Sequence, residues 1–167
     1  CSNIVFKPDD EFQVAIVISS SNVVLNMREY TLTQKNKIKN VYGIVTTRDI
    51  KRVTITGIKN VASVKNFTLS NIRVYGRSEY ITIENILSQQ DIPVQLNNDQ
   101  IPVNFDDMFQ LSINLGISIG EGDTFGVHML ETDKSNLVKH LLLKNVTCNG
   151  STIGLQTIFT YNFKVIN

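Results

Sequence analysis

The sequence predicts an all-β protein built from short repeated strands, and three observations support this prediction. First, a six-residue phrase recurs with apolar residues at its first, third and sixth positions and Gly or Asn at its fifth. Second, apolar and polar residues alternate within the phrase, as in a strand with one buried face. Third, Ile, Val, Thr and Asn are abundant and Ala is scarce, which favours strands and bends over helices. Copies occur at 53–58, 67–72, 81–86 and 141–146.

The fifth position of each phrase predicts a sharp bend after a strand. It is occupied by Gly57, Asn71, Asn85 and Asn145, and Gly and Asn enter the left-handed backbone region more readily than other residues. Strand, bend and strand repeated along a chain predict a solenoid. We expect the three asparagines in or near turns, bonded along a ladder.

The other elements follow in order along one domain, 1–167, which we interpret as part of a longer or processed chain. Polar residues at 1–12 predict a leading loop, and strands are expected at 12–18, 23–27, 30–32 and 41–45. Two Ile-Pro-Val triplets lie at 92–94 and 101–103. Proline cannot donate to a strand ladder, so 88–108 is interpreted as a loop excursion. Residues 130–142 fit strand, turn and strand better than a short helix.

The strand starts repeat with a period. One series recurs at spacings of 28 to 30 residues, and a second series interleaves with it. The three central phrases lie 14 residues apart, which we interpret as half a coil on opposite faces. A coil of this length predicts about five to six coils, with neighbouring strands about 4.8 Å apart. Ile55, Ile83 and Leu143 are expected in the core. The first series is Val23, Val53, Ile81, Leu111 and Leu141, and the second is Val14, Val41, Phe67, 94–103, Phe125 and Ile153.

Two longer phrases, 43–55 and 126–146, have the form Gly, apolar strand, polar turn, apolar strand. With them, most of the chain resembles the right-handed parallel β-helix (pectate-lyase-like) superfamily, which implies that fold. Residues 115–120 also resemble the His-Gly-Leu/Ile-Ser-Ile-Gly stretch of polygalacturonases. Leu115 stands where that histidine would be, so we expect a strand bounded by bends there and no inherited catalysis.

Charge is distributed unevenly. Residues 35–77 hold ten basic residues and one acid, whereas ten acids and four lysines follow from Glu79 onward. In a solenoid this predicts a basic half and an acidic half. The functional interpretation is a basic face for an acidic glycan, or pairing of complementary ends; the alternative is simple solvation of outward positions. The candidate ligand-binding residues are Arg48, Lys51, Arg52, Arg73 and Arg77.

Acidic residues give a candidate metal site. Asp91, Asp106 and Asp107 fall in or near the 88–108 excursion, and Ca²⁺ prefers several carboxylate oxygens on one surface. We expect no cofactor, with Ca²⁺ at these three residues as the alternative. His128 and His140 have no ligand partner in the sequence and are expected to be structural. Trp is absent, so sugar stacking would fall to the tyrosines, which are Tyr30, Tyr42, Tyr75, Tyr80 and Tyr161.

The remaining features bound the setting of the chain. Two cysteines, Cys1 and Cys148, are too few for a disulfide framework, and their spacing suits no metal site. We expect a terminal thiol and a small apolar residue, with a bond between the two as the alternative. The leading Cys-Ser resembles a mature bacterial lipoprotein start, and a cut through a larger chain is the favoured alternative. Neither a membrane span nor a signal peptide is expected. The formal net charge of +1 favours neither nucleic acid nor a membrane surface. Sequons at Asn66, Asn145 and Asn149 are weak indicators of secretion.

Two functions follow from these observations. The first is a non-catalytic structural or adhesive module of a surface, fibre or virion assembly, located outside the cell, at its surface or on a virion. Its partners would be a protein or further copies of the chain, a trimer included, and an acidic glycan. The second is a polysaccharide lyase or glycoside hydrolase acting on acidic polysaccharide. The missing catalytic signatures favour the first, and the analogy with β-helix surface proteins such as phage tailspikes rests on fold alone.

Overall fold

A computed structural model describes residues 2–36, 38, 40–91, 115–120, 137–151, 153–157 and 160–167. All regular secondary structure in this part of the chain is β-strand, so the predicted all-β class is confirmed. The strands are β1 (Ile4–Phe6), β2 (Val14–Ile18), β3 (Val23–Asn26), β4 (Thr31–Gln34), β5 (Tyr42–Thr46), β6 (Lys51–Thr56), β7 (Ser63–Lys65), β8 (Ser70–Tyr75), β9 (Glu79–Glu84), β10 (Leu87–Gln89), β11 (Leu115–Gly120), β12 (Val138–Lys144), β13 (Thr147–Asn149), β14 (Ile153–Thr157) and β15 (Thr160–Ile166).

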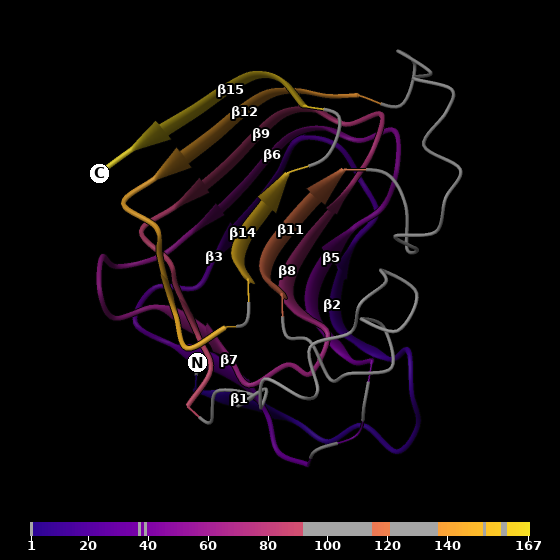
Figure 1. The fold of residues 1–167 in the computed structure, drawn as a ribbon, viewed down its shortest axis with the longest axis vertical. Helices are drawn as coiled ribbons and strands as arrows, with labels where there is room; N and C mark the ends of the chain where they lie inside the picture. Colours follow the sequence, from indigo (N-terminus) through magenta and orange to yellow (C-terminus); the bar gives the residue numbers. More distant parts are fainter. Residues whose placement is uncertain are drawn as a thin grey trace, which may run out of the picture.

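The strands form three five-stranded sheets, stacked in register (Figure 1). Sheet A has the order β1-β4-β7-β10-β13, sheet B the order β2-β5-β8-β11-β14, and sheet C the order β3-β6-β9-β12-β15. Every neighbouring pair is parallel. Along the chain, each strand of sheet A is followed by one of sheet B and then one of sheet C. This arrangement is compatible with a parallel β-helix.

The predicted period agrees with the register of sheet C from Val23 to Ile81 and not beyond it. Val23 pairs with Val53, Val53 with Ile81, and Ile81 with Leu141. Because Ile81 pairs directly with Leu141, the regular spacing ends at β9; Leu111 lies outside the described residues. The described members of the interleaved series lie in sheet B or shortly before its strands, and Val14 of β2 pairs with Tyr42 of β5. Residues 94–103 and Phe125 lie outside the described residues.

The half-coil interpretation was correct that successive phrases alternate between two faces, but each round has three faces and not two. The phrases at 53–58 and 81–86 belong to neighbouring strands of sheet C, and the phrase at 67–72 leads into β8 of sheet B. Sheet A supplies a third, shorter strand in each round, such as β7 with three residues. Its strands are too short to show a clear alternation, which is why the pattern suggested only two faces.

The predicted bends are confirmed at two of four positions. Asn85 and Asn145 follow β9 and β12 in the left-handed region, at φ 57° and 49°, and the Asn145 amide donates to Asn85 Oδ1 at 3.0 Å. Asn71 instead lies inside β8, buried, where its amide donates to Ser88 Oγ at 2.9 Å. Gly57 has no positive φ; a Cβ there would lie 2.1 Å from that of Ala62. Close packing, not backbone conformation, therefore explains this glycine.

The core lies between the three sheets and consists of aligned apolar columns. In sheet B, Ile16, Ile44 and Ile72 pair across successive strands, and the column continues to Ile117. The predicted core residues Ile55, Ile83 and Leu143 are confirmed, since all three are buried. They are also direct neighbours in sheet C.

Two predicted segments lie partly beyond the described residues. The excursion at 88–108 overlaps β10 through Ser88 and Gln89, and residues 92–108 fall outside, so it stays a prediction. The predicted strand at 115–120 is confirmed as β11, with Ile117 and Ile119 buried. The part of 130–142 that is described begins β12.

Candidate functional site

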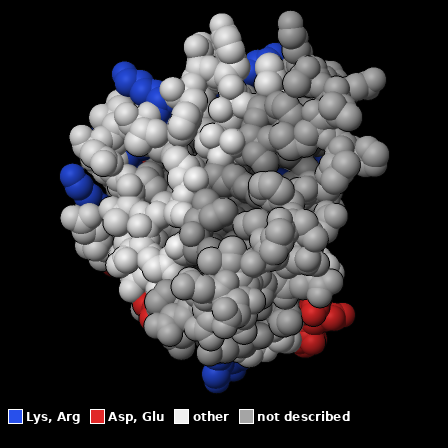
Figure 2. Space-filling view, in the orientation of Figure 1, with Lys and Arg blue, Asp and Glu red and all other residues white. Residues whose placement is uncertain are grey.

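The five predicted ligand-binding cations do not gather at one place. Lys51 and Arg52 begin β6 in sheet C, and Arg73 lies in β8 of sheet B. Arg48 and Arg77 lie in the turns before β6 and β9. On the face drawn in Figure 2, the described charged side chains form separate groups near the margin, with no continuous basic patch.

Two of these cations lie against one tyrosine ring. The guanidinium carbon of Arg73 is 4.9 Å from the centre of the Tyr75 ring, and that of Arg48 is 5.8 Å away. Arg73 also donates to Ser118 Oγ of the neighbouring strand, and it is only 5% exposed. Burial and these contacts give Arg73 a structural role in sheet B.

Arg77 is held in an ion pair across neighbouring turns. Its Nη2 lies 2.7 Å from Asp49 Oδ2, and both residues adopt positive φ. Both side chains are substantially exposed, so the pair adds little to stability. The pair places Asp49, the one acid of residues 35–77, beside Arg77, so it neutralises part of the positive charge of that segment.

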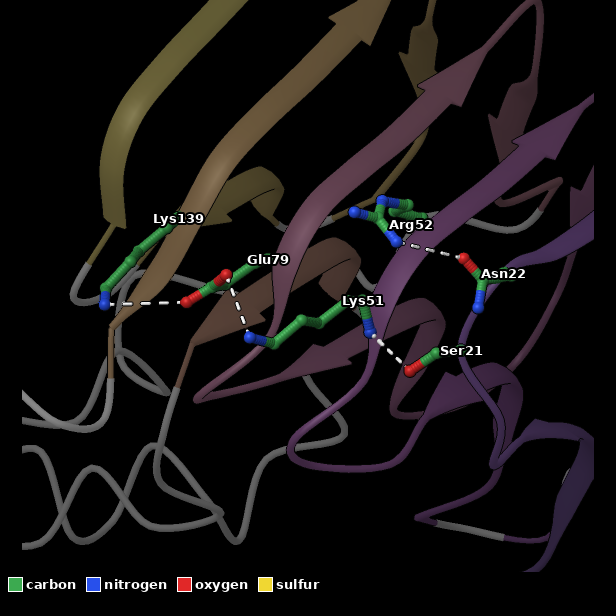
Figure 3. Close-up of polar contacts among 6 residues, drawn as sticks. All are labelled: Ser21, Asn22, Lys51, Arg52, Glu79 and Lys139. Atoms are coloured by element: carbon green, nitrogen blue, oxygen red, sulfur yellow. Dashed lines mark hydrogen bonds and ion pairs between the residues drawn. The ribbon is translucent and has the colours of Figure 1, made fainter.

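Lys51 belongs to a row of alternating charge at the start of sheet C. Lys51 pairs with Glu79, and Glu79 with Lys139, in the register of β6, β9 and β12. Glu79 lies between the two ammonium groups, at 3.3 Å from Lys51 and 3.6 Å from Lys139 (Figure 3). The hydrogen bond from Lys51 is the main reason that the pKa of Glu79 is lowered, against a smaller opposing effect of desolvation. We call these three residues the charged row.

A second set of residues lies beside the charged row, one in each strand of sheet C or immediately before it. All five members have left-handed backbone conformations, with φ between 53° and 61°. Asparagine and, to a lesser degree, histidine are enriched in that conformation, whereas for arginine and tyrosine it is unfavourable. We call this set the left-handed column. Its members are Asn22, Arg52, Tyr80, His140 and Asn162.

Side chains of the left-handed column contact one another along the stack. The Tyr80 and His140 rings are parallel, with centres 4.6 Å apart and planes 4° apart. Tyr161 meets His140 edge-on at 6.3 Å, and the Asn162 amide nitrogen lies 3.3 Å from His140 Nδ1. At the other end, Arg52 Nη1 donates to Asn22 Oδ1 at 3.5 Å (Figure 3). Asn22 precedes β3, and β3 and β9 flank β6 on opposite sides, so this bond directs the guanidinium away from β9.

The left-handed column is open to solvent and lies in a cationic setting. Tyr80 is 51% exposed and Tyr161 57%. Together the column and the charged row carry three cations, Lys51, Arg52 and Lys139, and one carboxylate, Glu79. Arg52 has no carboxylate partner among the described residues. This region combines an exposed ring with excess positive charge, so it can stack on a ring-shaped ligand and attract an anion.

Sequence reasoning identified part of this site. It selected Lys51 and Arg52 for their charge and named Tyr80 and Tyr161 among the tyrosines available for stacking, but treated His140 as structural only. The repeat of sheet C is the sequence signal that could have grouped these residues. Arg52, Tyr80 and His140 each directly precede the paired residues Val53, Ile81 and Leu141.

The predicted metal site is only partly described. Asp91 is exposed, and its carboxylate accepts from the Asn66 amide at 2.9 Å and from the Gln89 amide at 2.6 Å. Asp106 and Asp107 lie outside the described residues, so a Ca²⁺ site there stays a prediction. Within the described ranges, no three His, Cys, Asp or Glu side chains come together in a way that could hold a metal ion.

Cys148 offers no reactive thiol. It lies in β13 beside Ser88 of β10, and burial raises the pKa of its thiol to about 11. The thiol is therefore protonated and a poor nucleophile near neutral pH. Cys1 lies outside the described residues.

No apolar helix of membrane-spanning length occurs in the described part of the chain. Comparisons with protein-family models, with curated proteins and with solved structures found no match to this sequence. The function of the site must therefore be argued from its own geometry.

Proposed function

We propose that the chain is a non-catalytic parallel β-helix module, right-handed as in the pectate-lyase-like superfamily, which binds a glycan or protein partner through the outer face of sheet C. The observation that carries the proposal is the left-handed column, which presents exposed side chains at one position on successive strands. Strands in a sheet lie about 4.8 Å apart, so these groups form a regular surface. Such a surface suits adhesion in a cell-surface, fibre or virion assembly.

The packing behind this face and the charges on it favour binding without turnover. Val53, Ile81 and Leu141 pack in the core one residue after the column positions, and each is buried. Hydrolysis of a glycoside needs two carboxylates set apart across the scissile bond. In the charged row the single carboxylate, Glu79, is paired with two lysines and is thereby held ionised. That state suits positioning of charge more than proton donation.

Exposed apolar residues of β15 support the protein-partner part of the proposal. β15 lies at the edge of sheet C, where Phe163 and Val165 continue the columns of Leu141 and Leu143. These two side chains are 38% and 54% exposed. An edge strand with apolar side chains is a surface to which another strand can add. Partner chains, including copies of this one in a trimer, would be detected by light scattering after size-exclusion chromatography.

A paired binding and turnover assay tests the proposed function. The labelled chain is applied to a glycan array and to candidate protein partners, and the same sample is incubated with acidic polysaccharides while reducing ends and unsaturated products are measured. We expect binding without product. Release of product would contradict the proposal and favour a lyase or hydrolase.

Matched variants locate the binding face. Thr82→Glu places a longer, negatively charged side chain at the centre of the outer face of sheet C, between the buried Ile81 and Ile83, where it obstructs a partner and repels an acidic one. Thr33→Glu makes the same change on the outer face of sheet A, next to the buried Leu32. Binding should be lost in the first variant and retained in the second. Equal binding by both variants would exclude sheet C as the binding face.

A further inference from the structure

We propose that the open face of the Tyr80 ring, between Arg52 and His140, binds a sugar ring that carries an anionic substituent. This inference rests on the proposed binding role of sheet C and names the ligand class and the residues. The shared chemistry is a six-membered sugar with a carboxylate or a sulfate.

The geometry of the rings leaves one face of Tyr80 available. His140 of β12 stacks on one side of the ring, at 4.6 Å and nearly parallel. The opposite face is directed toward β6, because β6 and β12 flank β9 on either side. Among the described residues, the one ring contact that Tyr80 makes is with His140. The C–H face of a sugar packs well on such an exposed tyrosine ring.

Charge next to this open face selects an anion. Arg52 lies on the β6 side, and within the described ranges its guanidinium makes one long hydrogen bond, to the neutral Asn22. Lys51 and Lys139 share the one carboxylate of Glu79, so the local balance is positive. A guanidinium binds carboxylate and sulfate oxygens through two parallel hydrogen bonds. A sugar resting on Tyr80 would bring its acidic group toward Arg52.

Backbone conformation gives a supporting argument that these side chains serve binding. Within one column, the outer positions are Asn22 and Asn162, the residue type that tolerates positive φ. The three inner positions hold Arg52, Tyr80 and His140 at φ 56°, 57° and 55°. Residues kept in a conformation unfavourable to them, here Arg52 and Tyr80, cluster at functional sites. Phe12, Arg28 and Arg77 have positive φ outside the column, so the backbone conformation supports the assignment only together with the ring and charge geometry.

The test uses the full chain and short defined probes. Affinities are measured by calorimetry for a disaccharide containing glucuronate, for a sulfated glucose disaccharide, and for the neutral glucose disaccharide. We expect an acidic probe to bind at least about tenfold more tightly than the neutral one, and the preference to shrink as salt rises. The two acidic probes distinguish carboxylate from sulfate. Equal affinity for the neutral probe, or binding of none of the probes, would overturn the inference.

Substitutions test the two residues that carry the proposal. Arg52→Asn and Tyr80→Asn remove the cation and the ring while placing a residue suited to the left-handed conformation. Each should weaken acidic-probe binding about tenfold, with the melting temperature held within about 4 °C. Tyr80→Phe retains the ring and should retain binding. Unchanged affinity in both Asn variants would contradict the inference.

Arg28→Asn is the matched control for the cation. Arg28 is also an exposed arginine with positive φ, at 50°, but it lies in the turn after β3, outside the left-handed column. Its replacement should leave acidic-probe affinity unchanged; a loss equal to that of Arg52→Asn would show a general charge effect and overturn the site assignment. Failure of this inference and failure of the proposed function are distinguishable. If no sugar probe binds but another partner still binds sheet C, the inference fails and the proposed function stands. If the chain releases product from an acidic polysaccharide, the proposed non-catalytic function fails, whereas sugar binding at Tyr80 can still hold.

Discussion

Sheet C has left-handed residues at both ends of its strands, and the two ends use different residue types. After β9 and β12, Asn85 and Asn145 occupy these positions and bond to each other. At the strand starts, Arg52, Tyr80 and His140 occupy them; Arg52 and Tyr80 are exposed and His140 is half-buried. Asparagine fits this backbone conformation, whereas arginine and tyrosine do not. This contrast separates positions chosen for the fold from positions available for recognition.

The contrast also distinguishes two kinds of ladder. The asparagine pair connects neighbouring strands through a 3.0 Å amide hydrogen bond, so it contributes to the stacking of the sheet. The Tyr80 and His140 pair connects the same two strands through exposed rings. Removing the first should therefore affect stability, and removing the second should mainly affect binding.

The largest expected loss of stability comes from a substitution in the buried interior of β9. Ile83 is fully buried between Ile55 and Leu143, so Ile83→Ala leaves a cavity. We expect a loss of about 2–5 kcal/mol in the free energy of unfolding, measured with urea. Thr82→Ala, on the outer face of the same strand, should cost much less. Comparable losses from both would mean that the inward and outward positions are misassigned.

The asparagine bend should give the next largest effect. Asn145→Ala removes the hydrogen bond to Asn85 and puts alanine at φ 49°, so we expect a loss of about 2–3 kcal/mol. Asn145→Gly removes the hydrogen bond alone and should cost about 1 kcal/mol. Urea unfolding of the two variants separates conformation from hydrogen bonding. If glycine cost as much as alanine, the backbone conformation would not matter at this bend.

Arg52→Asn should have a smaller effect of the opposite sign. It relieves an unfavourable backbone conformation and loses only a 3.5 Å hydrogen bond to Asn22. We expect the free energy of unfolding to rise by about 0.5–1 kcal/mol, read as a higher melting temperature. A clear loss of stability would indicate that Arg52 serves the fold, which would remove the contrast between the two ends of sheet C.

The smallest expected effect is the pH dependence of the charged row. Lys51 lowers the pKa of Glu79 in the folded chain, so the folded state favours the ionised carboxylate. Its contribution is present above the ordinary glutamate pKa and is lost as pH falls through the lowered value. The stability difference between the wild-type chain and Glu79→Gln should therefore shrink on acidification and with added salt. A difference that is independent of pH would rule out this ion pairing.

Much of the fold followed from local pattern. Alternation at Val53 and Ile55 and again at Ile81 and Ile83 predicted strands with one buried face, because strand side chains alternate strictly between the two faces. The bend at Asn85 followed from the conformational preference of its residue type. Asn71 had the same place in the phrase but lies inside a strand, since burial and its hydrogen bond to Ser88 outweigh that preference.

The sequence by itself determined most strands of sheets B and C, their inward residues and the repeat up to β9, because these depend on neighbours along the chain. Only the tertiary structure decided the third sheet, the ladder between Asn85 and Asn145, and the meeting of Tyr80 with His140. Those contacts depend on how many residues each round contains, and the chain between β9 and β12 breaks the regular spacing. Charge alone selected Lys51 and Arg52; register placed them beside Glu79 and Tyr80, because parallel pairing brings matching positions of successive strands together.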